Sequence, residues 1–305
     1  MQWLAVAAVF IGSLLFAVGN HTDKFLVDKE RDGSSLESVM LFSTLVAGPI
    51  MLLAMLIYAK FEIAFAPIPA ALAVLAAISY TLANYFYFRA LEKNDTTVVI
   101  AMTQLIPVFT FIISAVFFQE FLTTRQMIGG AIIIASAVAI STNLKDLKNR
   151  QNYQVLGLML LFSLFYAGFF KLFEVANKTS DYGSASVFFQ FGLTLVGVFL
   201  WLRRKYRREF IKSIKQNGRV FVGLNVFNEI INAVAAQLDN WAVIFLPLAI
   251  VNTLAGFQPV FVLILGLVGA KFWPKIFQDK VSRGELIRKS FCILISLVGL
   301  YVMFS

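Results

Sequence analysis

The chain is a succession of long apolar runs separated by short polar segments. Each run holds about twenty residues, and at roughly 1.5 Å per residue a helix of that length crosses a hydrocarbon core about 30 Å thick. The polar segments are too short to build a soluble domain with its own core. The pattern predicts an all-α polytopic membrane protein with ten transmembrane helices. They cover residues 3–22, 38–59, 69–91, 96–118, 124–142, 153–175, 184–202, 219–241, 245–270 and 285–304.

Two runs in corresponding places of the two halves each carry a glutamine and a proline in their interior. Gln104 and Pro107 interrupt the run 96–118, and Gln258 and Pro259 interrupt its counterpart in the second half. The tripeptide Pro-Val-Phe begins at each proline, so it recurs after 152 residues. A proline removes one helix hydrogen bond and frees a carbonyl, which at membrane depth has to face protein or a wet cavity. Such broken helices in corresponding places are typical of an internally duplicated transporter.

A polar segment divides the ten runs into five and five. It is the stretch NLKDLKNRQN at 143–152, so the predicted units are a first five-helix repeat at 1–142, this connector, and a second repeat at 153–305. Because five is odd, the second half has to cross the membrane in the opposite direction. The sequence therefore predicts two inverted repeats.

The basic residues are concentrated on one side of the predicted membrane. Of the 26 lysine and arginine residues, 22 lie in or beside loops that follow odd-numbered runs. The positive-inside rule then places these loops in the cytoplasm and both termini outside. The block 203–219 dominates this assignment; it is interpreted as a topological anchor, with binding of anionic lipid headgroups as the alternative. The net charge of +9 thus reflects membrane orientation and does not indicate nucleic-acid binding.

Composition narrows the class further. The chain is 59% hydrophobic with a mean hydropathy of +0.80, values that suit a membrane protein. Its one cysteine, Cys292, lies in an apolar run, so no intramolecular disulfide is expected. The first run follows no basic segment and precedes no convincing small-residue cleavage site, so it is interpreted as a retained helix.

A motif between residues 85 and 141 resembles a known family. It joins an Ala-Leu pair after the third run, a Pro-Val-Phe in the fourth, a Glu followed by Leu-Thr, and a Gly pair in the fifth. These elements are Ala90–Leu91, Pro107–Phe109, Glu120, Leu122–Thr123 and Gly129–Gly130. The segment resembles the first-repeat signature of the EamA-type drug/metabolite transporter superfamily. The second repeat departs from it, because Phe272 stands where Glu120 would be matched. The resemblance implies a central pocket lined by runs one, three, four, six, eight and nine.

The eighth run is unusually polar. Asn225, Asn228, Glu229 and Asn232 recur at helical spacing, which predicts one stripe facing the bundle interior or water. An unpaired charge at the middle of a span costs at least a few kcal/mol, so Glu229 has to be protonated, paired or solvated. A proton-linked or cation-binding role is one interpretation. A structural hydrogen bond to a neighbouring helix is the other.

Two further charged positions have alternatives of the same kind. Lys171 either pairs with Glu174 one helical turn away or offers its charge to a solute carboxylate or phosphate. His21 lies close to Asn20 and Asp23 at the end of the first run, either at the membrane interface or lining a cavity. As the only histidine, it does not indicate a metal site.

Other candidates for the pocket are amide or phenol side chains within the runs, and each could equally hydrogen-bond between helices. They are Tyr80, Asn84, Gln104, Asn252 and Gln258. The sequence has no phosphate-binding glycine loop, nucleophile elbow or metal-ligand cluster, so neither an enzyme nor a cofactor is indicated.

These patterns predict a secondary transporter in an inner (plasma) membrane, as a monomer or homodimer. It would move a small zwitterionic or amphipathic, amino-acid-like metabolite by alternating access, with export favoured over import. Glu229 would be the protonatable group, Lys171 and the amides would bind solute, and Pro107 and Pro259 would act in gating. The alternatives are an importer or exchanger of sugar phosphates or nucleotide sugars, and a non-transporting sensor or assembly subunit.

Overall fold

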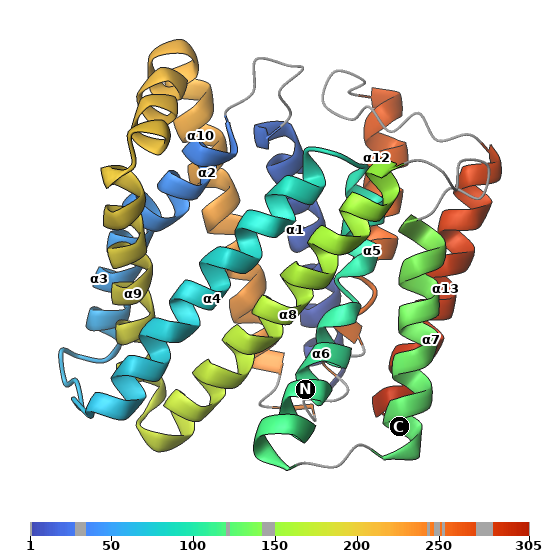
Figure 1. The fold of residues 1–305 in the computed structure, drawn as a ribbon, viewed down its shortest axis with the longest axis horizontal. Coiled ribbons are helices and arrows are strands. Elements are labelled where there is room, and N and C mark those ends of the chain that lie inside the picture. The colour runs from blue at the N-terminus through green and yellow to red at the C-terminus, as the bar shows by residue number, and fades with distance from the viewer. Residues whose placement is uncertain are drawn as a thin grey trace.

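The computed structural model describes residues 2–27, 35–119, 123–141, 150–242, 245–246, 251, 254–272 and 283–304. Within these ranges the chain forms helices joined by turns and short extended segments, and no strand occurs (Figure 1).

The predicted runs correspond to thirteen helical segments in the described ranges. They are α1 (Gln2–Val27), α2 (Leu36–Leu41), the π-helix η2 (Phe42–Ala47), α3 (Gly48–Tyr58), α4 (Pro67–Leu91), α5 (Thr96–Met102), α6 (Leu105–Phe118), α7 (Thr124–Ser141), α8 (Arg150–Thr179), α9 (Tyr182–Leu202), α10 (Arg204–Ala242), α12 (Gln258–Phe272) and α13 (Arg283–Phe304).

Eight stretches of the described chain are long and apolar enough to cross a membrane, and α12 is a shorter apolar helix. The second predicted run is built from α2, η2 and α3, and the fourth from α5 and α6. The connector predicted at 143–152 is partly helical, because α8 already begins at Arg150. Polar residues can extend a helix beyond the apolar core into the interface, where water and headgroups solvate their side chains.

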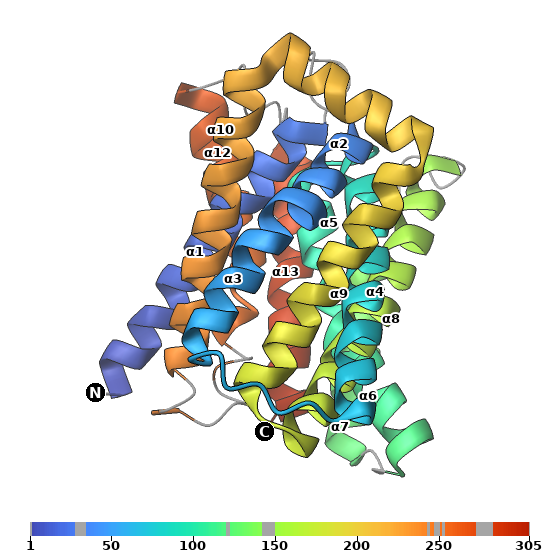
Figure 2. The same ribbon diagram turned by 90° about the vertical axis from the view of Figure 1, so that its left-hand side faces the viewer.

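Helices from the two halves run in opposite directions and pack against each other. In Figure 1, α1 rises where α8 descends, and α4 rises where α10 descends. α4 lies along α8 and α1 lies along α10, while α6 contacts α8 and α12 contacts α1. α7 packs along α13. Figure 2 shows the first part of α10 arching across the upper end of the bundle before the helix descends beside α1.

The fourth run breaks before its proline. α5 ends at Met102, a turn covers Thr103 and Gln104, and Pro107 lies in the first turn of α6. The carbonyl of Thr103, which a continuous helix would pair with residue 107, instead accepts from the Ile106 N–H at 2.9 Å. The expectation of a free carbonyl is therefore wrong. The N–H groups in the first turn of a helix have no partner within that helix, so a proline there costs no hydrogen bond. The chain therefore ends one helix and begins another just before the proline.

The second break has the same form. A turn at Gly256 and Phe257 precedes α12, and Pro259 is the second residue of that helix. The Phe257 N–H bonds to the Leu254 carbonyl at 3.0 Å, and the Val260 N–H bonds to the Phe257 carbonyl at 2.9 Å. Both interrupted runs thus contain a short turn immediately before a helix with proline in its first turn.

Candidate functional site

A buried polar cluster lies where α1, α4 and α10 meet. Asp23 of α1 is only 7% exposed, and its Oδ1 accepts from Asn228 Nδ2 at 2.7 Å. The Tyr87 hydroxyl lies 3.2 Å from Asp23 Oδ2 and 3.0 Å from Asn20 Oδ1. We call Asn20, Asp23, Tyr87 and Asn228 the Asp23 cluster. Its hydrogen bonds join three helices inside the bundle, where lipid could not satisfy these groups.

Glu229 lies beside this cluster on α10. The Ser43 hydroxyl donates to Glu229 Oε1 at 2.6 Å, so the carboxyl group contacts the π-helix η2. π-helical turns occur frequently at functional sites. Glu229 is also near enough to Asp23 and to Tyr80 for electrostatic interaction with both. Two carboxyl groups from different helices therefore share one region of the interior.

The side chains of the predicted polar stripe of α10 contact different parts of the structure. Asn228 and Asn232 face α1 at Gly19, where a Cβ would lie 3.1 and 2.6 Å from their Oδ1 atoms. The absence of a side chain at Gly19 is what allows these amides to approach α1. Asn225 instead donates Nδ2 to the Phe221 carbonyl of its own helix at 2.8 Å. Its buried amide is thus bonded within α10.

Aromatic rings from α8 and α9 surround Tyr80 of α4. Its ring centroid is 5.2 Å from that of Phe169, 5.9 Å from that of Tyr166 and 5.8 Å from that of Phe189. Asn84 lies one turn further along α4. Tyr80, which interacts electrostatically with Glu229 and Asp23, thus lies among these rings.

Lys171 and His21 occupy separate positions. Lys171 Nζ lies 3.1 Å from Glu174 Oε2, and Glu174 Oε1 lies 2.5 Å from Lys178 Nζ, so the internal ion pair considered above is present. His21 is buried, with Nε2 at 3.0 Å from the Val262 carbonyl oxygen. The imidazole thus joins α1 to α12 instead of lying in an exposed interface.

The remaining candidates lie at the two helix breaks. Gln104 is buried and donates Nε2 to the Gly256 carbonyl at 3.0 Å. Gln258 is half-buried at the first position of α12. Asn252 lies outside the described residues.

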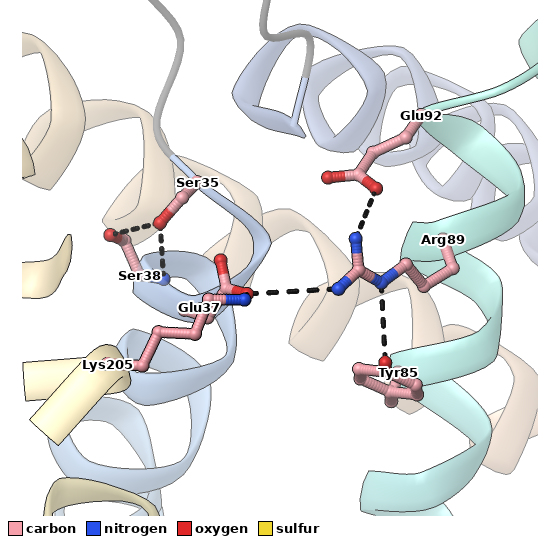
Figure 3. A network of polar contacts seen from close by, with 7 residues as sticks. All are labelled: Ser35, Glu37, Ser38, Tyr85, Arg89, Glu92 and Lys205. Carbon is pink, nitrogen blue, oxygen red and sulfur yellow. Dashed lines mark hydrogen bonds and ion pairs between the residues drawn. The ribbon is translucent and has the colours of Figure 1, made fainter. Parts of the chain in front are cut away.

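An ionic network joins α2, α4 and α10 at the upper end of the bundle (Figure 3). Glu37 Oε1 lies 2.6 Å from Lys205 Nζ and 3.8 Å from Arg89 Nη2. Arg89 also contacts Glu92 Oε2 at 2.9 Å and donates Nε to the Tyr85 hydroxyl at 3.4 Å. The bond to Glu37 raises the pKa of the Lys205 ammonium above its ordinary value. Three helices are therefore held together at this end.

Several residues of the site were not among the candidates that the sequence pattern indicates. The sequence pattern draws attention to Asp23 only as a neighbour of His21, although a carboxylate one turn from a polar amide near the end of an apolar run is a usable signal. Tyr87 and Ser43 give no signal of their own, because tyrosine and serine are ordinary in membrane helices. Within the described ranges no group of three or more His, Cys, Asp or Glu side chains could hold a metal ion.

Comparison with known proteins agrees with this architecture. Residues 1–142 match the EamA-like transporter family. The match assigns the first half of the chain to this family. Together with the apolar helical bundle, it supports a multi-pass membrane transporter. The matching family is described as one of transporters.

The similarity in fold to a solved structure extends over both halves of the chain. A solved structure titled only "Crystal structure of protein" aligns over 98% of this chain and 95% of its own, with a TM-score of 0.51 and 12% sequence identity. At this identity the similarity concerns the fold alone. No curated protein matches the chain.

Proposed function

We propose that the protein is a secondary transporter built from ten membrane spans in two inverted five-helix repeats. The opposite directions of α1 and α8, and of α4 and α10, support this arrangement. So does the pair of helix breaks that meet at Gln104 and Gly256. In such a protein the two repeats rock against each other around a central site, which opens to each side in turn.

The observation that carries the proposal is the set of polar groups at the meeting of α1, α4 and α10. Asp23 and Glu229 contact amide, phenol and hydroxyl groups of Asn228, Tyr87 and Ser43. Ionisable groups inside a membrane bundle are costly and are typically retained where they bind solute or protons. We therefore place solute binding here.

The chemistry of the site favours a solute that carries an amine. Carboxylates attract an ammonium group, and the rings around Tyr80 offer their faces to a cation or to an apolar portion. A small zwitterionic or amphipathic, amino-acid-like metabolite has both features. An anionic sugar phosphate would need several cationic side chains, whereas Lys171 already contacts Glu174.

Export is the direction we propose. The end of α4 and the start of α10, which adjoin two of the basic loops, lie at the upper end in Figure 1, and the positive-inside rule assigns this end to the cytoplasm of an inner-membrane protein. The network of Glu37, Arg89 and Lys205 holds that end together, so the site would open on the other side. Protons entering from outside would exchange with the solute at Glu229, while the helices that begin near Pro107 and Pro259 would move as gates.

Metabolite profiling of medium and cell extract tests this proposal. Cells expressing the protein are compared with cells expressing Glu229→Gln, and with Glu174→Gln as a control acid outside the proposed site. A solute that accumulates in the medium with the intact protein and the control, but not with Glu229→Gln, supports export through this site. Faster uptake of a solute would replace export by import. No difference in either direction, with all three proteins present in the membrane, would contradict the transport function.

A further inference from the structure

We infer that Asp23 is a second proton-binding group of the transporter, and that Tyr87 and Asn20 form a switch that satisfies it both with and without its proton. The inference rests on the proposed function for its role in coupling, because it adds a proton site beside the one assigned to Glu229. The ligand proposed for Asp23 is the proton, so the solute does not have to be identified for the test.

The environment of the Asp23 carboxyl group favours proton binding. It is buried, and its hydrogen-bond partners are the neutral groups of Asn228 and Tyr87. Within the described ranges no cationic side chain forms an ion pair with it. Neutral partners offset only a small part of the free-energy cost of burying a charged carboxylate. Binding a proton removes the charge and with it that cost.

The titratable groups around Asp23 do not supply the missing positive charge. On the same helix as Asp23, the Lys24 ammonium group donates a hydrogen bond to the Leu91 carbonyl, and His21 contacts the Val262 carbonyl. From α4 the neighbouring groups are the phenols of Tyr87 and Tyr80. From α10 it is Glu229, whose charge opposes a second negative charge nearby.

The Tyr87 hydroxyl lies between two acceptors but has a hydrogen for only one of them. The Tyr87 hydroxyl has one hydrogen but lies within bonding distance of two acceptor oxygens, Asn20 Oδ1 at 3.0 Å and Asp23 Oδ2 at 3.2 Å. It can donate to only one of them. If it donates to Asn20, Asp23 completes the chain by carrying a proton on Oδ2 and donating it to the Tyr87 oxygen. All three oxygens are then joined by two hydrogen bonds.

The same three residues also accommodate a charged Asp23. The Asn20 Nδ2 group is buried and has no hydrogen-bond partner among the residues that the structure describes. Rotation of the Asn20 amide would present Nδ2 to the Tyr87 oxygen, and the Tyr87 hydroxyl would then donate to the Asp23 carboxylate. The cluster can therefore gain or lose a proton by turning one amide and one hydroxyl, without movement of the helices.

Asn228 connects this switch to the proposed solute site. Its Nδ2 holds Asp23 Oδ1, its Oδ1 is buried without a partner, and the next residue on α10 is Glu229. A change of charge at Asp23 therefore acts on the segment of α10 that carries Glu229. Proton binding at Asp23 and solute binding near Glu229 would be coupled through this contact.

Infrared difference spectroscopy of the full chain in lipid nanodiscs, recorded against pH, detects the C=O stretch of a protonated carboxyl group. In the intact protein we expect such a band at neutral pH. The part of the band that comes from Asp23 should be lost in Asp23→Asn and should persist in Glu229→Gln, which removes only the part that comes from Glu229. The exposed Asp181→Asn serves as the control and should leave the band unchanged. A band that is equally strong in Asp23→Asn would overturn the inference.

Tyr87→Phe provides a test that does not depend on replacing the acid. Loss of one hydrogen bond to the carboxyl group should move the midpoint of the band's pH titration by about one pH unit. An unmoved midpoint contradicts the switch. The spectrum is recorded without solute, so its outcome does not depend on metabolite profiling. A band assigned to Asp23 in a protein that exports no solute would contradict the transport function but support the proton site.

Discussion

Gln104 donates its side-chain Nε2 to the main-chain carbonyl of Gly256 at 3.0 Å, across 152 residues of sequence. The same interval separates Pro107 from Pro259, so the bond joins corresponding positions of the two interrupted runs. Both residues lie in the turns that precede α6 and α12. A main-chain carbonyl exposed by one helix break is thus satisfied by the side chain of the other.

Replacing Gln104 should therefore weaken the contact between the halves. Gln104→Leu keeps the apolar volume but leaves the buried Gly256 carbonyl without a donor, which should lower the stability by about 1–3 kcal/mol. The measurement is the thermal unfolding midpoint of the purified protein in nanodiscs. Thr110→Val is the matched control, because its hydroxyl bonds only to the Ile106 carbonyl of the same helix at 3.0 Å. Equal losses in the two variants would contradict a special role for the bond between breaks.

The network at the upper end should control access to the interior. Glu37→Gln removes the charge that holds Lys205 and Arg89, so this end should open more often. Ser38 is completely buried beside it and can be replaced by cysteine in a Cys292→Ala background. We expect roughly fivefold faster thiol labelling of Ser38→Cys when Glu37→Gln is added, which corresponds to about 1 kcal/mol.

Glu174→Gln is the control for this labelling experiment, because its ion pairs lie on α8 and do not involve α2. It should leave the labelling rate of Ser38→Cys unchanged. An accelerated rate in this control, or an unchanged rate in Glu37→Gln, would show that the network does not restrict opening.

Gly129 should be necessary for the contact between α7 and α13. A Cβ at this position would lie 2.6 Å from the Gly299 carbonyl oxygen and 2.7 Å from the Met303 nitrogen. Main-chain atoms cannot swing aside, so the helices have to separate, and Gly129→Ala should cost about 1–3 kcal/mol. A Cβ at Gly157 meets nothing within 4 Å, so Gly157→Ala should be neutral or stabilising. The comparison is made by thermal unfolding, and similar midpoints for the two variants would disprove the tight crossing.

Asp181 should stabilise the start of α9. Its carboxylate accepts from the Ser184 N–H at 2.9 Å, and hydrogen bonds from the side chain and the main chain of Ser184 hold the pKa of Asp181 below its ordinary value. A lowered pKa means that the stabilisation is present above the ordinary carboxyl pKa and is lost as the pH falls through the lowered one. Asp181→Ala should cost about 1 kcal/mol at neutral pH.

Asp181→Asn separates the cap from its charge. Asparagine caps a helix about as well as aspartate but does not titrate, so this variant should keep its stability at neutral pH and lose the acid-dependent part. Unfolding midpoints measured between neutral and acidic pH provide the comparison. If the intact protein and Asp181→Asn respond identically to acid, the cap makes no contribution through its charge.

The sequence by itself determined where the chain forms apolar helices and where two of them break. Length and hydropathy sufficed, because a run such as 69–91 has to satisfy its own main chain in lipid and can do so only as a helix. The breaks near Pro107 and Pro259 followed from the missing N–H of proline. The polarity of α10 around Glu229 was equally visible, since each of those residues is recognised from its neighbours in sequence.

Only the tertiary structure decided which polar groups meet. Asp23 contacts Tyr87 and Asn228, which lie 64 and 205 residues away, and no local pattern relates those positions. The structure also separated Asn225, bonded within its own helix, from Asn228, although both lie on the same predicted stripe. Helix formation depends on local composition, whereas the partner of a buried polar group depends on how helices cross. That choice is made by the packing of the whole bundle.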